Sequence, residues 1–144
     1  MANIIPTAFK TELLSGTHNF ATSGDSFKLA LYTSVGNYSA SSTVYLAGTT
    51  NAEVNPSGTS YPAGGQALGS QAVALSTSTA TVDFADETFA SVTLTASHAA
   101  IYNATNSNKL CLVLDFGGSK TATNGDFVVQ FPTANASDAI IRIA

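Results

Sequence analysis

Alternating apolar and polar positions follow Phe20 and predict β-strands. In residues 27–33, for example, Phe27, Leu29 and Leu31 fall on one face of an extended segment. Similar short runs recur through the second half, separated by Gly, Asn and Ser. The predicted strands are 27–33, 72–76, 81–84, 89–96, 99–103, 109–116, 127–131 and 139–143. Strands at this spacing predict an all-β fold, either an antiparallel β-sandwich or a jelly-roll-like barrel.

One predicted strand is almost wholly apolar. Residues 110–114 read Leu-Cys-Leu-Val-Leu, so we expect this strand to be central in its sheet. Its Cys111 is the single cysteine of the chain, which excludes an intrachain disulfide and predicts a buried, inert thiol. Turns are predicted at Asn106-Ser107-Asn108, Gly117-Gly118 and Asn124-Gly125.

The N-terminal arm, residues 1–20, contains the one helix candidate. Thr7 can cap its first turn and Gly16 can end it as the C′ residue. Phe9, Leu13 and Leu14 are expected on one face. Two turns are too short to be stable alone, so this helix must pack against the sheets or against a neighbouring subunit.

Residues 34–72 form a long excursion rich in Gly, Ser and Thr within a single domain, 1–144. Tyr38, Tyr45 and Tyr61 punctuate it, but it has too few apolar residues for a core of its own. Connections of this length inside a compact domain are usually functional or disordered. We expect the excursion to pack over a sheet edge or to reach a neighbouring subunit.

The amino-acid composition indicates a surface with few charged residues. Apolar residues make up 44% of the chain and charged residues only 10%, with a net charge of −4. Such a surface is compatible with subunit contacts, or with an ordinary neutral β-protein surface. The five basic residues are scattered, which argues against nucleic acid as a partner. The start resembles no signal peptide and no segment is long enough to span a membrane, so we expect folding in a cytoplasm.

Candidate catalytic or metal-binding residues are few. His18 and His98 have no metal-ligand spacing, and each is expected to be structural or simply exposed. Asp83, Asp86 and Glu87 form the one acidic cluster, which could bind an ion, although turn formation is the favoured interpretation. Because no nucleophile or phosphate-binding motif occurs, we expect no enzyme activity, no catalytic or metal site and no cofactor.

Two further polar features have a structural interpretation. Asp115, in Leu114-Asp115-Phe116-Gly117-Gly118, is predicted to accept a hydrogen bond from a backbone amide. The five tyrosines could stack against a sugar, but the chain has no Trp, and tyrosines in subunit contacts are the plainer account. A small-molecule ligand is therefore not expected.

Several segments, taken in order, carry a family resemblance. They are Phe9-Lys10, Glu12-Leu13-Leu14, Phe27-Lys28, Ala30-Leu31-Tyr32-Thr33-Ser34, Tyr61-x-x-Gly64-Gly65, Asp83-Phe84, Ala100-Ile101-Tyr102-Asn103, Leu114-Asp115-Phe116-Gly117, Phe131-Pro132 and Ala139-Ile140-Ile141-Arg142-Ile143. Over roughly residues 8–144 the chain resembles small virion structural proteins of tailed bacteriophages, including cyanophages and other marine phages. The resemblance implies a virion component and offers no catalytic residues to carry over.

Two hypotheses follow from the resemblance. In the first, the protein is a capsid decoration (cement) protein of the virion, assembled in the host cytoplasm, which binds the major capsid protein and copies of itself as a dimer or trimer. In the alternative it is a tail or head-fibre protein that acts as a receptor-binding adhesin. An exposed edge at the C-terminal strand, 139–143, would invite pairing with another chain. The candidate contact residues are Phe9, Leu13, Tyr38, Tyr45, Tyr61 and Arg142.

Overall fold

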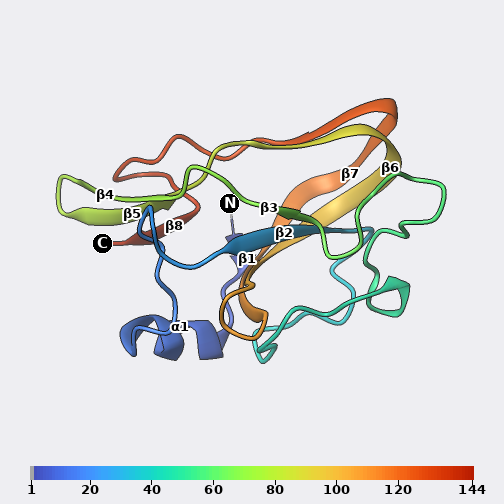
Figure 1. The fold of residues 1–144 in the computed structure, drawn as a ribbon. Helices are drawn as coiled ribbons and strands as arrows, with labels where there is room; N and C mark the ends of the chain where they lie inside the picture. Colours follow the sequence, from blue (N-terminus) through green and yellow to red (C-terminus); the bar gives the residue numbers. More distant parts are fainter. Residues whose placement is uncertain (1) are drawn as a thin grey trace.

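The computed structural model describes residues 2–144, with side chains from Ile4 onward. It consists of two antiparallel β-sheets and one short helix (Figure 1). Both sheets contribute to one main hydrophobic core. The predicted all-β sandwich with an N-terminal helix is therefore confirmed, whereas the barrel alternative is not, because the sheets do not close on themselves.

The larger sheet has five strands in the order β1-β7-β6-β2-β3. Their bounds are Ala2–Ile4 (β1), Phe27–Tyr32 (β2), Gln66–Ala67 (β3), Glu87–Asn103 (β6) and Lys109–Val129 (β7). The long β6–β7 hairpin dominates this sheet and bends across the molecule in Figure 1. β2 pairs along its whole length with the C-terminal half of β6, which places it in the middle of the fold.

The predicted boundaries inside this hairpin are wrong. The predicted strands 89–96 and 99–103 both belong to β6, and most of 109–116 and 127–131 belongs to β7. Gly117-Gly118 and Asn124-Gly125 lie within β7 instead of ending strands. Gly117 and Asn124 have φ of 77° and 48°, and the pairing register shifts along the hairpin. When one strand contains a bulge and its partner continues to pair with it, the hairpin bends but is not interrupted. Residues that favour a turn therefore need not end a strand.

The smaller sheet has three strands in the order β4-β5-β8 and lies at the left of Figure 1. Their bounds are Ala72–Ser76 (β4), Thr79–Asp83 (β5) and Ile141–Ile143 (β8). β5 pairs with β8 through Val82 opposite Ile141 and Ala80 opposite Ile143. The predicted C-terminal strand thus exists but begins at Ile141, and the chain before it is irregular.

The part of the larger sheet around β2 is buried on both faces, whereas the far ends of the β6–β7 hairpin are exposed on one face. Phe27, Leu29 and Leu31 of β2 belong to the main core between the sheets, while Ala30 and Tyr32 belong to a second cluster on the opposite face. The segment 110–114 is similarly divided between the two clusters, and none of its residues is more than 1% exposed. Its predicted central position is confirmed.

The 34–72 excursion covers this second face. It contains one 3₁₀ turn (Thr49–Asn51) and β3, and in Figure 1 its teal part lies at the right, away from the smaller sheet. Tyr38 is part of the second cluster, and Tyr45 and Leu46 pack against it. An isolated backbone bridge also joins Val44 to Lys109. The excursion also runs along the outer edge of β2, through β3 and a bridge between Tyr32 and Glu53, so the predicted packing over a sheet edge is confirmed.

The helix α1 (Thr7–Leu14) differs from its prediction at two points. Pro6 occupies the N-cap position, and the backbone amide of Thr7 donates to the carbonyl of Ala40 at 2.9 Å, so Thr7 does not cap. Gly16 follows the helix with φ 75°, as expected. Phe9 is buried but Leu14 is 90% exposed, because five residues of helix turn Leu14 well away from the Phe9 face.

Candidate functional site

Ser97, His98 and Asp115 meet beside the bend of β6 and β7. His98 Nδ1 lies 2.8 Å from Ser97 Oγ, and its Nε2 lies 3.7 Å from Asp115 Oδ2. These are the residue types of a hydrolytic triad, but the buried Ser97 hydroxyl donates its one hydrogen to the carbonyl of Thr33 at 2.8 Å. The hydroxyl must then accept from His98, so the imidazole is not placed to remove its proton.

Asp115 has a structural task in the same region. Its Oδ1 accepts the backbone amide of Gly117 at 2.7 Å. The predicted contact with a backbone amide is confirmed, although it stabilises a bend within β7 and not a strand end. Ser97 therefore has no base placed to remove its proton, and Asp115 is already used to hold the backbone. The three residues do not form an activated serine nucleophile.

Cys111 is fully buried, as predicted, and its nearest polar side chain is His18. The Sγ lies 3.9 Å from His18 Nδ1, which also faces Asn103 Nδ2 at 3.0 Å. Burial raises the pKa of the Cys111 thiol, and the carboxylates of Glu12 and Asp25 raise it further. The thiol therefore stays protonated at neutral pH. The proximity of His18, 93 residues away in sequence, could not be seen in the sequence.

A polar network ties α1 to the larger sheet. Glu12 accepts from Lys109 Nζ at 2.6 Å and pairs with His18 Nε2 at 2.9 Å. Burial would raise the pKa of Glu12, but these hydrogen bonds outweigh it and the pKa is lowered. Asn103, a fully buried side chain on β6, donates to both His18 and Asp25. The network orients the N-terminal arm and is satisfied internally.

A second polar network centres on Glu53, a buried residue of the excursion. Its Oε2 accepts from the Tyr45 hydroxyl at 2.8 Å and the Gly48 amide at 2.7 Å. Its Oε1 accepts from the Tyr61 hydroxyl at 2.9 Å and the Gly64 amide at 2.8 Å. One carboxylate thus cross-links four points of the excursion. Sequence reasoning missed Glu53, whose signal was a lone acidic residue in a segment rich in Tyr and Gly.

The acidic cluster separates in the structure. Asp86 accepts the backbone amide of Phe131 at 2.8 Å, and Glu87 accepts from Gln66 Nε2 at 2.9 Å. Burial raises the pKa of Glu87, against the smaller opposing effect of Gln66. Within residues 2–144 no group of three His, Cys, Asp or Glu is placed to hold a metal ion. The contact of Asp86 agrees with the favoured structural interpretation of this cluster.

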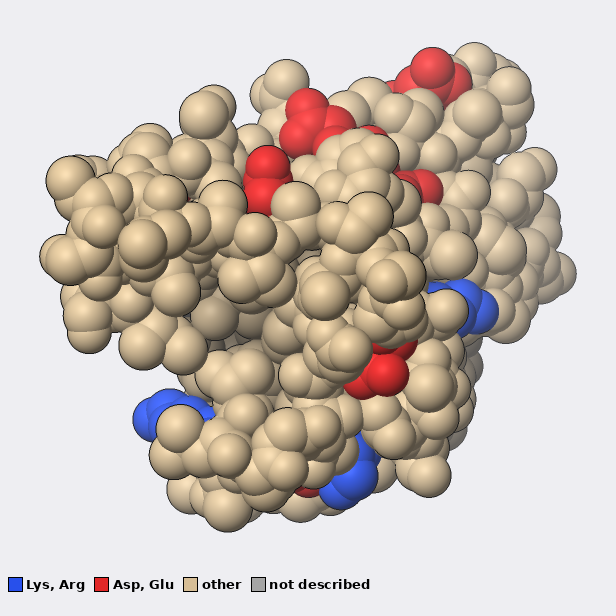
Figure 2. Space-filling model, turned by 60° about the vertical axis from the view of Figure 1, so that its left-hand side comes forward, with Lys and Arg blue, Asp and Glu red and all other residues tan. Residues whose placement is uncertain are grey.

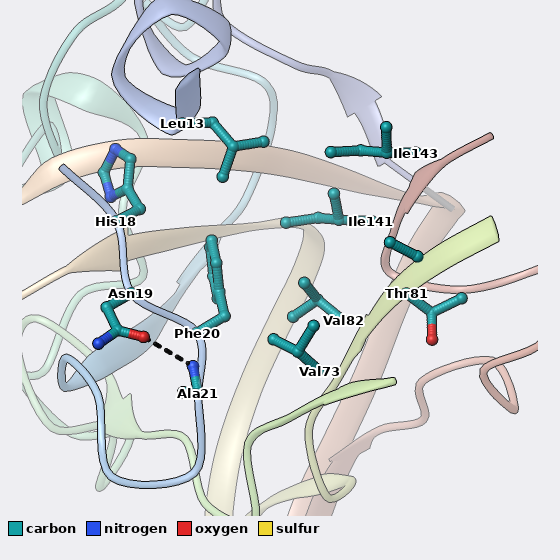
Figure 3. Close-up of a pocket in the computed structure, with 11 residues that line it drawn as sticks. Leu13, His18, Asn19, Phe20, Ala21, Val73, Thr81, Val82, Ile141 and Ile143 are labelled. Atoms are coloured by element: carbon teal, nitrogen blue, oxygen red, sulfur yellow. Dashed lines mark hydrogen bonds between the residues drawn. The ribbon is translucent and has the colours of Figure 1, made fainter. Parts of the chain in front are cut away.

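A hollow on the surface lies between α1 and the smaller sheet (Figure 3). One part, with a volume of about 350 Å³, runs from the loop at Phe20 to β4, β5 and β8. An adjoining part of about 300 Å³ runs between α1 and β8. The two parts share Leu13, Ile141 and Ile143. We call them together the helix–sheet groove.

The helix–sheet groove is apolar and ends in exposed apolar side chains. Leu14, Ile143 and Ile5 at its outer rim are 90%, 54% and 39% exposed. Lys10 and Arg142 also line this outer part, so two cations flank an apolar surface. Figure 2, which brings the left side of Figure 1 forward, shows a surface that is mostly uncharged. Exposed apolar groups of this kind are typical of interaction sites.

Comparisons with known proteins were made for the whole chain. No protein-family model, curated protein or solved structure matches it. Among the described residues, no helix combines the length and apolar character needed to cross a membrane.

The candidate contact residues occupy different environments. Phe9, Tyr38 and Tyr61 are each at most 5% exposed, so the expectation that they contact partners is wrong: they pack inside the protomer. Tyr61 also donates to Glu53, and the hydroxyls of Tyr38 and Tyr32 lie 2.8 Å apart. Burial raises the pKa of both Tyr38 and Tyr61.

The remaining candidates are more accessible. Leu13 and Tyr45 are partly buried, and Arg142 is exposed. The fold brings Leu13 and Arg142 to the helix–sheet groove, while Tyr45 lies on the other side of the larger sheet, stacked on Tyr102 at 4.4 Å between ring centroids. Leu14, Ile5 and Ile143, which form the exposed rim, were not among the predicted contact residues. The apolar character of Leu14 and Ile143 was visible in the sequence, but their exposure depends on the tertiary fold.

Proposed function

We propose that this protein is a bacteriophage capsid decoration protein that binds the major capsid protein through the helix–sheet groove. The observation that carries the proposal is the exposed apolar rim of this groove, flanked by Lys10 and Arg142. The resemblance in the order of sequence segments supplies the biological setting. Such a protein works by binding: each bound copy stabilises the shell because it has affinity for the assembled state.

The chemistry of the groove defines its partner. Apolar side chains of the capsid subunit would cover Leu14 and Ile143, and a carboxylate would lie near Lys10 or Arg142. Full burial of one leucine contributes about 1.5–3 kcal/mol. Many copies on a symmetric lattice would reinforce such modest single contacts if neighbouring copies also touch.

An enzymatic role has less support. The Ser97 hydroxyl donates away from His98, and Cys111 is buried with a raised pKa. Every buried side-chain nitrogen or oxygen of the described residues has a hydrogen-bond partner. Among these residues no buried polar side chain is therefore left unpaired for a substrate. An adhesin would need an exposed contact surface, and the tyrosines that could have stacked against a sugar are mostly internal: Tyr32, Tyr38, Tyr61 and Tyr102 are each at most 5% exposed.

A binding assay on capsid shells stripped of this protein tests the proposal. Leu14→Glu places a charge at the exposed rim without disturbing the core, and we expect roughly 10–100-fold weaker binding. Val128→Glu is the matched control, because Val128 is 49% exposed on β7, outside the groove. Deleting α1 would be a poorer test, since Phe9 is part of the core.

The outcomes separate the two hypotheses. Wild-type binding by Leu14→Glu would exclude the groove as the docking surface. If the intact protein does not bind shells but binds host cells, the decoration role is wrong and the adhesin alternative gains support. Counting copies per particle gives a second readout: hundreds indicate decoration and a handful indicate a tail component.

A further inference from the structure

In β4, three of the five residues are exposed and the other two are partly buried. Val73 and Leu75 are 55% and 73% exposed, and Ala74, on the opposite face, is exposed as well. β4 is an edge strand, paired with β5 only. None of the described segments pairs with its outer side. A strand edge of this kind is a template for another chain.

The backbone of β4 has a definite set of outward groups. Thr77 and Ser78 form a two-residue connection, with Ser76 opposite Thr79. In such a hairpin the closing pair exchanges hydrogen bonds, and hydrogen-bonded and non-hydrogen-bonded pairs then alternate along the ladder. Ala74 therefore bonds to β5, whereas the N–H and C=O groups of Val73 and Leu75 point away from it.

The other sheet edges are protected or short. β8, the opposite edge of the smaller sheet, carries Arg142 at its centre, and antiparallel pairing about that residue would place two arginines opposite each other. The edges of the larger sheet, β1 and β3, contain three and two residues. β4 has five residues, with no charge and no proline. It is the least protected edge, and not the C-terminal strand that the sequence favoured.

We propose that β4 pairs antiparallel with β4 of a second copy of this chain, with Ala74 on the two-fold axis. Val73 then lies opposite Leu75 of the partner subunit, and the same pair repeats across the axis. Each pair of Val73 with Leu75 across the axis is a hydrogen-bonded pair, in which the two residues exchange two N–H···O=C bonds. The outward N–H and C=O groups of Val73 and Leu75 are all satisfied in this way. Shifting the register by two residues would lose one of these pairs.

The side chains also match in this register. Val73 and Leu75 share one face with Val82 and Ala80 of β5 and with Ile141 and Ile143 of β8, since directly paired residues point to the same side. Joining two copies continues this apolar face across six strands. Val73 and Leu75 would each meet an apolar neighbour, and the small Ala74 would meet its own copy at the close approach of a non-hydrogen-bonded pair.

This dimer specifies the self-contact within the proposed decoration function. It leaves the rim of the helix–sheet groove at Leu14 free for the capsid. The dimer is measured without shells, and shell binding is measured separately. An absent dimer would therefore contradict the β4 pairing alone, and absent shell binding would contradict the decoration function alone.

The test uses charge at the two-fold axis. Ala74→Lys and Ala74→Glu each place like charges opposite each other, and we expect each variant to raise the dimer dissociation constant at least tenfold in sedimentation equilibrium. An equimolar mixture should restore a dimer of one Lys and one Glu subunit. Ala90→Lys, at an exposed alanine of β6, should dimerise like the wild type. Far-ultraviolet circular dichroism of each variant checks folding.

A cysteine variant tests the same pairing independently, in case Ala74→Lys or Ala74→Glu does not fold. Residues opposite each other in a non-hydrogen-bonded pair have Cα atoms about 4.5 Å apart, which suits a disulfide. Ala74→Cys should therefore form a disulfide-linked dimer under mild oxidation, faster than the Ala90→Cys control. A wild-type protein that stays monomeric, an Ala74→Lys variant that dimerises normally, or a mixture that stays monomeric would each overturn the proposed pairing.

Discussion

The two sheets differ in how much of their surface the rest of the chain covers. Around β2 the larger sheet is enclosed between the main core and the 34–72 excursion, so β2 is buried on both faces. The smaller sheet is covered less completely: its central strand β5 is mostly buried, but the edge strand β4 exposes Val73 and Leu75. Both sheets carry alternating apolar residues. The difference shows that an apolar strand is a stability element where the chain covers it and a contact surface where it does not.

A leucine-to-alanine substitution should reduce the free energy of unfolding by very different amounts in the two sheets. Leu112, in the larger sheet, is fully buried, whereas Leu75, on β4, is 73% exposed. We expect Leu112→Ala to reduce the free energy of unfolding by about 2–5 kcal/mol and Leu75→Ala to change it by less than about 0.5 kcal/mol. Urea unfolding at low protein concentration, where the protein is monomeric, measures both. Equal losses would show that the contrast between the sheets is wrong.

The cover of the larger sheet should depend on Glu53. Glu53→Ala leaves two tyrosine hydroxyls and two backbone amides without their acceptor, so we expect a loss of about 2–4 kcal/mol in unfolding free energy. Glu87→Ala is the matched control, because Glu87 accepts from Gln66 alone. Urea unfolding of both variants is the measurement. A loss for Glu53→Ala no larger than that for Glu87→Ala would exclude a central role of Glu53.

Much of this fold was visible in the sequence, because period-two alternation reports which residues face a core. The β2 alternation and the buried run around Cys111 were predicted correctly for this reason. The bends of β6 and β7 were not, since Gly117 and Asn124 have backbone conformations that suit a turn or a bulge equally well. Only the pairing of each strand with its partner across the hairpin decides between a turn and a bulge.

The candidate sites were harder to predict. Glu12, His18 and Lys109 meet through tertiary contacts that no local motif announces. The exposure of Leu14 follows from how α1 docks, and its apolar character alone suggested a buried side chain. The tyrosines were misplaced for the opposite reason. Tyrosines are common in subunit contacts, but the backbone amide of Leu46 and the carboxylate of Glu53 supply internal hydrogen-bond partners for Tyr38 and Tyr61.

Acid should weaken the attachment of the N-terminal arm to the larger sheet. Burial would raise the pKa of Asp25, but hydrogen bonds from Asn19, Asn103 and Asn106 outweigh it and lower the pKa below its usual 3.8. A lowered folded-state pKa stabilises the fold above pH 3.8, and this contribution is lost as the pH falls through the folded value. Unfolding free energy measured between pH 7 and pH 2 should fall less steeply for Asp25→Asn. Identical slopes would contradict this role.

The smallest expected effect lies at the turn of the smaller sheet. Thr77 has φ 53°, a left-handed conformation that a β-branched residue adopts at a cost. Thr77→Gly should therefore raise the unfolding free energy by up to about 1 kcal/mol, seen as a higher melting temperature. Ser78, its neighbour, has no positive φ, so Ser78→Gly should be neutral or destabilising. A lower melting temperature for Thr77→Gly would contradict the strain at this position.

The order of strands in the two sheets has a consequence for folding speed. β2 pairs with β6, with Phe27 opposite Asn103, and β5 pairs with β8, with Val82 opposite Ile141. The β4–β5 and β6–β7 hairpins join consecutive strands directly, whereas the consecutive strands β2 and β3 pair across residues 33–65. Chains dominated by such distant pairings fold on a scale of milliseconds to seconds. Stopped-flow refolding should therefore show a slow main phase, and the open edge of β4 would be available to other chains throughout that interval.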